Sequence, residues 1–200
     1  VFAMLGQAGL LSLPYPEGMG GGVRGLDPGY GLGEEGLGDG DVVEVDGLEI
    51  RVVGTPGHTA DSLSVLLPAE QAVLTGDTVL GRGTTVVAHP DGQLGAYLDS
   101  LDRLHALAER HEVERIWPGH GPVIDQALGA LDYYIAHRHE RLDQVRAALA
   151  QLESAPHPEG ISVDELPRRV VEIVYTDVDP VLSGAAELSV LAQLAYLQAR

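Results

Sequence analysis

Three short segments, each directly after a run of apolar residues, constrain most strongly what this chain can fold into. They are residues 55–59, which contain His58; residues 75–78, which contain Asp77; and residues 118–121, which contain His120. Apolar, β-branched runs that end beside Pro or Gly are typical of a strand followed by a sharp turn. Each segment therefore places a side chain of the kind that binds metal ions just beyond a predicted strand.

The connections between these segments predict that they meet at one edge of a sheet. Residues 62–67 and 72–76 read as two strands joined by a short polar turn, and such a hairpin brings its outer ends together. A predicted helix over 93–110 leads to a strand at 113–117, and a strand–helix–strand crossover makes the two strands parallel. Ligands of open α/β sheets gather at the edge where such strands end. Two imidazoles and a carboxylate that converge there suit a borderline metal such as zinc.

The remainder of the chain divides into a Gly-rich beginning, a patterned centre and a helical tail. Alternating apolar residues on both sides of Asp46-Gly47 predict a hairpin. Apolar residues at helical spacing predict a long helix over 125–152, with Asp125 as its N-cap. We therefore expect three parts: an irregular segment over 1–40, a metal-binding domain over 41–153 and a small helical subdomain over 154–200.

The tail carries two further helix signals. Residues 162–165 have the pattern of a capping box, which opens a helix. Residues 185–200 are apolar on one side and predict the last helix. The pattern by itself predicts only a small helical subdomain.

Charge limits the partners that the chain can have. The formal net charge is −18, and every basic residue is Arg. An acidic surface repels polyanions, which argues against broad nucleic-acid binding. A local RNA site stays open, because bound divalent ions invert the charge of a cleft.

Hydropathy and cysteine content bear on location. The chain has no Cys and therefore no disulfide. No apolar run approaches the ~20 residues that span a bilayer. Residues 2–13 are apolar but lack a basic flank, so we expect no signal peptide. Taken together, we expect a cytoplasmic protein that does not bind membranes.

The three segments resemble the second half of a metallo-β-lactamase-fold hydrolase over residues 38–140. The stretch 80–92 is similar to the branch that contains β-lactamase-like protein 2, a metal-dependent endoribonuclease, and its bacterial relatives. The tail resembles the winged-helix-like module that follows the catalytic domain in that branch. The resemblance implies an α/β fold: the C-terminal part of an αββα metallo-β-lactamase sandwich, followed by a small, partial, winged-helix-like helical subdomain.

The resemblance also implies a chemistry. In complete relatives two zinc ions share a water-derived nucleophile, and by resemblance Asp77 would bridge both ions, His58 would bind one and His120 the other. The substrate would carry an ester-type bond, either a phosphodiester in RNA or a thioester, as in the glyoxalase II relatives that share the three motifs. His89, within the branch-specific stretch, is a candidate for substrate contact or else a surface loop histidine.

One motif of the family is absent. The N-terminal His-x-His-x-Asp-His cluster does not occur, and no histidine precedes His58. We therefore expect either a fragment or a chain whose first half is lost or replaced, with fewer zinc ions or none and little hydrolysis by this chain alone. The rival hypothesis is a catalytically inactive binding or scaffold protein that retains half of the fold. Half of a sandwich leaves an apolar sheet face uncovered, so we expect a homodimer or poor solubility.

Several other polar residues receive weaker assignments. Asp61 either orients a ligand or forms a turn, and Thr78 is a candidate to hydrogen-bond the Asp77 carboxylate. His137 and His139 lie two apart in a predicted helix, so they point roughly 200° apart and cannot share one metal. These two are interpreted as solvated, and the remaining histidines, His105, His111 and His157, as surface residues.

Overall fold

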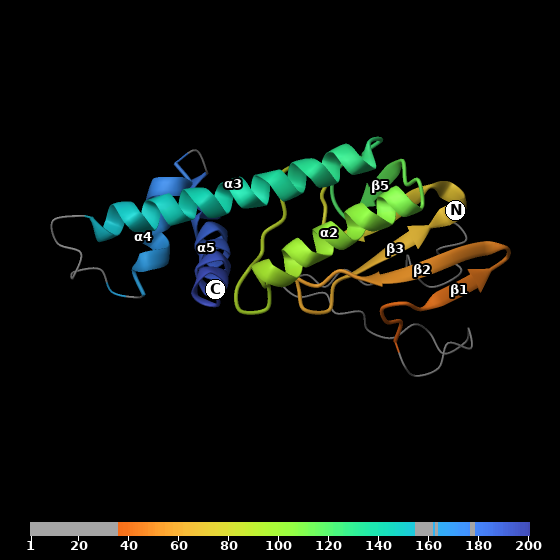
Figure 1. Ribbon diagram of the computed structural model, residues 1–200, viewed down its shortest axis with the longest axis horizontal. Helices are drawn as coiled ribbons and strands as arrows, with labels where there is room; N and C mark the ends of the chain where they lie inside the picture. The colour runs from red at the N-terminus through yellow and green to blue at the C-terminus, as the bar shows by residue number, and fades with distance from the viewer. Residues whose placement is uncertain (1–35, 155–161, 163, 177–178) are drawn as a thin grey trace.

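A single sheet with two helices on one side, continued by a helical tail, forms the structure (Figure 1). This computed structural model describes residues 36–154, 162, 164–176 and 179–200. Most of the Gly-rich segment and His157 lie outside the described residues. Among the described helices, none is both long and apolar enough to cross a membrane.

The sheet has five strands in the order β1-β2-β3-β4-β5, which is also their order in the sequence. Neighbouring strands are antiparallel from β1 to β4, whereas β5 is parallel to β4. Both the predicted hairpin and the predicted parallel return of the chain are therefore confirmed. The strands are β1 (Val42–Val45), β2 (Leu48–Gly54), β3 (Leu63–Leu67), β4 (Ala72–Gly76) and β5 (Arg115–Pro118).

The two hairpin turns use left-handed backbone conformations. Asp46 and Gly47 between β1 and β2 have φ of 49° and 84°, as a two-residue turn with two positive φ angles requires. Between β3 and β4, the short helix η2 (Pro68–Glu70) ends at Gln71 with φ of 47°. The Asp-Gly signal thus predicted the first turn correctly.

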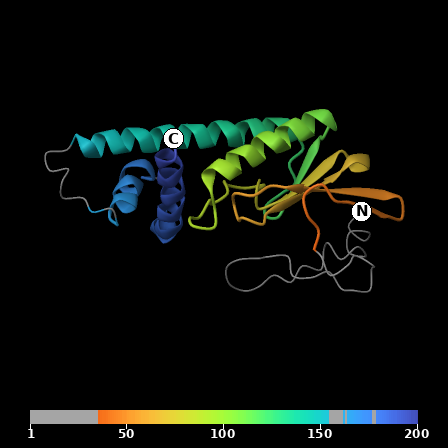
Figure 2. The same cartoon turned by 60° about the horizontal axis from the view of Figure 1, so that its bottom comes forward.

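Helices α2 (Leu94–Arg110) and α3 (Ala127–Glu153) lie on the same side of the sheet, with α2 nearer to it (Figure 2). Their apolar stripes pack on the sheet residues Val73 and Ile116 to form the main core. The prediction that Asp125 caps α3 is wrong. The N-cap position is Gln126, without a side-chain cap bond, and the N–H of Ala127 donates instead to the carbonyl of Glu114 at 3.0 Å. That tertiary acceptor removes the need for a capping side chain at this N–H.

The tail contains helix α4 (Leu166–Val174), the short helix η4 (Pro180–Leu182) and helix α5 (Ser183–Gln198). Helices α4 and α5 pack on the C-terminal half of α3 around Val145, Val170 and Val190, at the end of the molecule away from the sheet (Figure 1). The Glu165 carboxylate accepts the N–H of Ser162 at 3.3 Å, which is the Glu half of the predicted capping box. A small helical subdomain is present, and its likeness to a winged helix stays a prediction.

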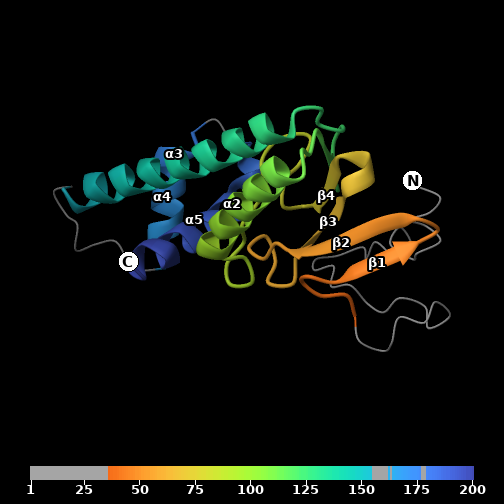
Figure 3. The same cartoon turned by 45° about the vertical axis from the view of Figure 1, so that its right-hand side comes forward.

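The second face of the sheet is also apolar. Leu48, Ile50 and Leu67 are buried there, and Leu74 and Trp117 are partly buried around them. Among the described residues, both α2 and α3 lie on the other side of the sheet, as Figure 3 also shows. The expected homodimer stays a prediction.

Candidate metal centre

The three side chains that the sequence singled out converge at one edge of the sheet. The Nε2 atom of His58 lies 3.8 Å from Oδ2 of Asp77, and the Nε2 atom of His120 lies 3.5 Å from Oδ1 of Asp77. The side chains are 29%, 38% and 52% exposed for His58, Asp77 and His120, so a bound ion could be reached from solvent. The three side chains therefore lie together at the sheet edge, as the predicted strand connections implied.

These distances can be compared with what zinc requires. Zinc binds imidazole nitrogen at about 2.0–2.1 Å and carboxylate oxygen at about 2.0–2.2 Å in tetrahedral geometry, so two such ligands of one ion stand about 3.4 Å apart. The observed separations of 3.5 and 3.8 Å are close to this value. Each imidazole is paired with a different oxygen of Asp77.

The described residues do not complete a metal site. Within residues 36–154 and the described tail, no group of three or more His, Cys, Asp or Glu side chains is arranged so that it could hold one ion. The arrangement is two pairs that share Asp77, and each pair offers one nitrogen and one oxygen. A zinc site in an enzyme ordinarily has three protein ligands. The donor types fit zinc, and the number of donors per ion falls short.

His58 is held in a defined orientation. Its Nδ1 lies 2.7 Å from the carbonyl oxygen of Val86. A carbonyl can only accept, so Nδ1 carries the hydrogen, and in the neutral ring Nε2 then has a free lone pair. The same Nε2 faces Asp77. Histidines that bind metals are typically oriented in this way by a hydrogen bond at the other ring nitrogen.

Asp77 stands immediately after β4, where the backbone turns sharply. Gly76 has φ of 52°, and the N–H of Thr78 donates to the carbonyl of Thr75 at 2.9 Å. The hydroxyl of Thr85 donates to the main-chain carbonyl of Asp77 at 2.7 Å. The turn and this bond fix the backbone and leave the carboxylate free to face the two histidines.

The prediction that Thr78 hydrogen-bonds the Asp77 carboxylate is wrong. Thr78 is buried, and its hydroxyl donates to the hydroxyl of Thr55 at 3.4 Å. The turn after β4 sends the side chain of Thr78 into the core, whereas that of Asp77 stays partly exposed.

His120 is positioned by closely packed backbone. A Cβ atom at Gly119 would lie 2.8 Å from Oδ1 of Asp77 and 3.0 Å from the main-chain carbonyl carbon of Gly76, so a side chain there would crowd both the carboxylate and the backbone. The N–H of Gly119 donates to the carbonyl of Gly76 at 2.7 Å, and the N–H of Gly81 donates to the carbonyl of His120 at 2.9 Å. The glycines around His120 therefore allow three segments of backbone to meet beside Asp77.

A buried polar layer beneath the site was missed by the sequence reasoning. It consists of Tyr97 on α2 and Tyr134 and Arg138 on α3. The Tyr97 hydroxyl donates to the carbonyl of Thr78 at 2.6 Å, and the Tyr134 hydroxyl accepts the N–H of Leu80 at 2.9 Å. Burial raises the pKa of both phenols, so both hydroxyls keep their hydrogens. Their positions in the apolar stripes of the two predicted helices are the signal that could have revealed them.

The other candidate residues lie in varied settings. The N–H of His89 donates to the carbonyl of Leu188 on α5 at 3.3 Å, and a contact of His89 with substrate stays a prediction. Asp61 is exposed in the turn after β2, and His139 is exposed as expected. The assignment of His105 to the surface is wrong: it is half-buried, and its Nε2 lies 3.1 Å from Asp132 across the α2–α3 contact.

His137 also departs from its expected solvated state. Its ring is half-buried and stacks on that of Tyr133, with centroids 5.9 Å apart. Burial, reinforced by the positive charges of Arg138 and Arg141, lowers the pKa of His137 below its ordinary value. The side chain leans on the helix surface because its neighbour four residues earlier is aromatic.

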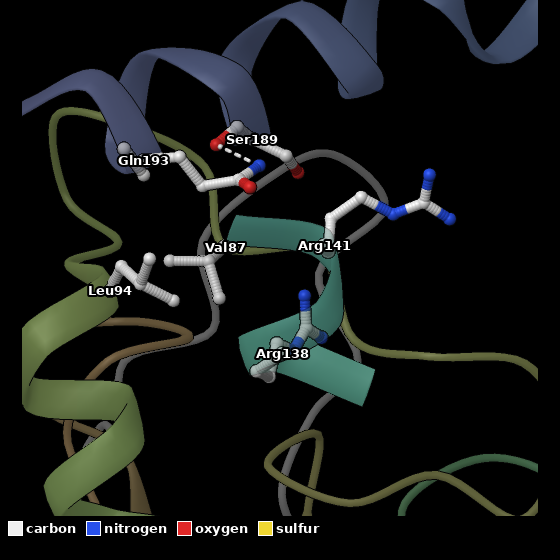
Figure 4. Close-up of a pocket in the computed structure, with 7 residues that line it drawn as sticks. Val87, Leu94, Arg138, Arg141, Ser189 and Gln193 are labelled. Carbon is white, nitrogen blue, oxygen red and sulfur yellow. Dashed lines mark hydrogen bonds between the residues drawn. The ribbon is translucent and has the colours of Figure 1, made fainter. Parts of the chain in front are cut away.

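A small pocket lies between α3, α5 and the segment that leads into α2 (Figure 4). Arg138 and Arg141 approach it from α3, and Ser189 and Gln193 from α5. Its volume of ≈ 10 Å³ is at the lower limit for a single water molecule and far below the size of a substrate site. The metal-type side chains lie elsewhere, on the partly exposed sheet edge, so this pocket is not the place for a substrate.

Comparison with known proteins gives a consistent result. The model of the metallo-beta-lactamase superfamily matches residues 7–120. The Beta-lactamase-like protein 2 homolog of Caenorhabditis elegans is 40% identical over 139 residues, which are 70% of this chain and 41% of that protein. The Lactamase-like protein vrtG of Penicillium aethiopicum is 37% identical over 157 residues, which are 76% of this chain and 48% of that protein.

The fold is similar to solved structures as well. A metallo-beta-lactamase family protein from Thermus thermophilus superposes with a TM-score of 0.62 at 26% sequence identity, over 82% of this chain and 48% of that one. This chain thus spans less than half the length of each of these three proteins.

Proposed function

Because this chain belongs to the metallo-beta-lactamase superfamily, we propose that it contributes His58, Asp77 and His120 as zinc ligands to a hydrolytic centre. The observation that carries the proposal is the position of Asp77 between the two imidazoles, with Nε2–oxygen distances of 3.8 and 3.5 Å to its two different oxygens. Such spacing suits ligand pairs of zinc.

Each of the three side chains has a defined task in this proposal. His58 presents the Nε2 lone pair, because Nδ1–H is engaged by Val86. Asp77 offers one oxygen to each side, and Gly119 leaves that carboxylate its space. Bound zinc would lower the pKa of a water molecule and polarise the bond to be cleaved. The partial exposure of all three residues leaves room for a substrate beside them.

The proposed substrate class is an ester-type bond, either a phosphodiester in RNA or a thioester. The relatives include homologs of β-lactamase-like protein 2 as well as fungal lactamase-like proteins. The net charge of −18 weighs mildly against a polyanionic substrate. The likeness of residues 80–92 to the RNase-type branch weighs in favour of RNA, so the two bonds should be assayed side by side.

Native mass spectrometry with a small molar excess of zinc tests the metal role. We expect weak zinc binding, weakened at least about tenfold further in Asp77→Asn because both pairs share this carboxylate. His58→Ala and His120→Ala should each weaken binding too. Asp99→Asn is the matched control, since Asp99 is an exposed carboxylate on α2 with no assigned part in the metal centre. Equal zinc retention by the wild-type chain and Asp77→Asn would refute the assignment.

A second candidate function is a catalytically inactive binding or scaffold protein. It is favoured by one observation: in the described part of the chain no three metal-type side chains form a group that could hold one ion. Hydrolysis of bis(p-nitrophenyl) phosphate and of acetylthiocholine, measured with zinc present, separates the two candidates. Turnover that disappears in Asp77→Asn supports the hydrolase. A chain that binds no zinc and cleaves neither compound supports the binding protein.

We further propose a homodimer, because part of an αββα sandwich is expected to leave apolar surface that a second copy covers. Apolar faces of this kind are ordinarily covered in stable proteins. Light scattering during size-exclusion chromatography gives the mass directly. A stable, monodisperse monomer of 21.1 kDa would contradict the proposal.

A further inference from the structure

Residues 85–87 connect both His58 and Asp77 to the interior. The hydroxyl of Thr85 donates to the main-chain carbonyl of Asp77 at 2.7 Å, and the next residue, Val86, supplies the carbonyl that accepts Nδ1–H of His58 at 2.7 Å. Val87 then enters the core with 2% of its surface exposed. The orientation of the His58 ring therefore depends on where this short segment of backbone is held.

The side chain that holds the segment from below is Arg138 on α3. Its Nη2 donates to the carbonyl of Thr85, and its guanidinium lies 4.8 Å from the centre of the Tyr97 ring. Arg138 is only 9% exposed. Thr85 and Val86 share a peptide unit, so fixing the carbonyl of Thr85 fixes the orientation of the peptide plane that leads to the carbonyl of Val86.

Burial of the Arg138 guanidinium costs free energy, so its position in the interior needs a physical explanation. A buried charge is ordinarily paired with an opposite charge. In the described structure the partners of Arg138 are a carbonyl and an aromatic ring, and its Nε–H has no hydrogen-bond partner. An apolar side chain of similar length would fill the same space without that cost. An apolar side chain, however, could not donate a hydrogen bond to the carbonyl of Thr85, and a short polar side chain would not reach it.

We propose that Arg138 is a positioning residue that fixes residues 85–87 and thereby keeps His58 in the Nδ1–H tautomer, with Nε2 facing Asp77. The proposal rests on the proposed function, in which His58 binds zinc through Nε2. Without the fixed carbonyl of Val86, the hydrogen is free to move to Nε2. A hydrogen at that position faces the Asp77 carboxylate and occupies the lone pair that a metal needs.

Arg141, one turn further along α3, provides the contrast. Its Nη1 donates to the carbonyl of Val174 at 2.9 Å, and its guanidinium lies 4.5 Å from the centre of the Tyr175 ring. Both contacts are with the end of α4, and neither is with residues 85–87. The two arginines therefore share a helix and a kind of environment, but only Arg138 is bonded to the segment behind His58.

The test is the tautomer of His58 in metal-free, 15N-labelled protein. Long-range 1H–15N spectra of the imidazoles distinguish Nδ1–H from Nε2–H, and recording at about pH 8.5 keeps ordinary imidazoles neutral. The His58→Gln variant assigns the signal. We expect Nδ1–H in the wild-type chain, at least a halving of that population in Arg138→Met, and no change in Arg141→Met.

Each outcome has a defined meaning. An Nε2–H tautomer in the wild-type chain, or an unchanged Nδ1–H tautomer in folded Arg138→Met, would overturn the proposal. If Arg138→Met does not fold, Arg138→Gln is judged by the same criterion, because its amide is too short to reach Thr85. Failure of both variants to fold would overturn the positioning role in favour of a purely structural one. Since no metal is used, a tautomer shift combined with absent zinc binding would refute only the metal role.

Discussion

The two histidines that flank Asp77 are positioned by different means. His58 depends mainly on hydrogen bonds that lead inward, from Val86 through Thr85 to the buried Arg138. His120 depends on backbone that packs against backbone, with glycines at 119 and 121 and a bond from the N–H of Gly81 to its carbonyl. A close backbone contact exists on the His58 side too, where a Cβ at Gly57 would lie 2.3 Å from Cα of Tyr97.

Because the two histidines are held differently, the two sides of the site should be sensitive to different kinds of substitution. On the His58 side, the site should respond to the loss of single donors in the core, with moderate cost, because an unpaired buried carbonyl costs about 1–3 kcal/mol. On the His120 side, the backbone packs so closely that the addition of a single methyl group should be worse than the loss of a hydrogen bond. The following predictions test this contrast, beginning with the largest effect.

Gly81→Ala should be the most damaging of these substitutions. Its Cβ would lie 2.0 Å from the carbonyl oxygen of Pro122, so the backbone beside His120 must move. We expect a loss of about 3 kcal/mol in the free energy of unfolding, measured by urea denaturation. Gly83→Ala is the matched control: that position has φ of 73° and open space around it, so only about 1 kcal/mol should be lost. Equal losses would show that space beside Pro122 is not what matters.

Removal of two hydroxyl groups that donate to the carbonyl of Thr78 tests the His58 side. The hydroxyl of Tyr97 donates to the carbonyl of Thr78 at 2.6 Å, and the single hydrogen of the Thr85 hydroxyl is shared between the carbonyls of Asp77, at 2.7 Å, and Thr78, at 3.2 Å. Tyr97→Phe and Thr85→Val should each cost about 1 kcal/mol. The double variant should lose at least about 0.5 kcal/mol more than the sum, because the carbonyl then keeps neither donor.

The control for this cycle is Tyr133→Phe, since that ring is 57% exposed. Its free energy of unfolding should change by less than about 0.5 kcal/mol. Additive losses for Tyr97→Phe and Thr85→Val would mean that the carbonyl of Thr78 does not couple them, and the buried layer would then not act as a unit.

The smallest predicted effect is on how the stability of the chain depends on pH. Burial lowers the pKa of His137 in the folded chain below the ordinary 6.5, so the unfolded chain binds a proton there at pH values where the folded chain does not. Above the pKa of His137 in the unfolded chain, about 6.5, the free energy of unfolding is therefore at its full value. It falls as the pH drops from there toward the lower pKa of His137 in the folded chain. His137→Gln should make stability fall less between about pH 7 and pH 5.

His139→Gln is the matched control, because His139 is exposed on the same helix. Urea denaturation at several pH values measures the difference, which should be small since His137 is only half-buried. An acid response of His137→Gln identical to that of the wild-type chain would indicate that folding does not lower the pKa of His137.

Much of the sheet could be predicted because its signals are local. Asp46-Gly47 demands two positive φ angles, and the structure has them. The hairpin over β3 and β4 and the parallel return to β5 followed from strand spacing and the helix between them. That topology was enough to bring His58, Asp77 and His120 together, although none is near another in the sequence.

Three of the errors arose where a partner far along the chain replaced a local one. Asp125 was expected to cap α3, but the carbonyl of Glu114 takes up the first N–H of the helix. Thr78 was expected beside the Asp77 carboxylate and instead bonds Thr55 inside the core. His105 was expected at the surface and instead reaches Asp132 on the facing helix. In each case the local sequence pattern was typical of the predicted role, but the group bonded to a partner that is distant in the sequence.

The sequence by itself determined the family, the two hairpins, the parallel return of the last strand and the three side chains at the sheet edge, because turns and apolar periodicity depend on neighbouring residues. The tertiary structure alone decided which nitrogen of His58 faces Asp77, and it placed Arg138 beneath the segment that sets this orientation. The physical reason is that a hydrogen bond requires a donor and an acceptor within about 3 Å. Only the folded chain brings residues 58, 86 and 138 to that distance.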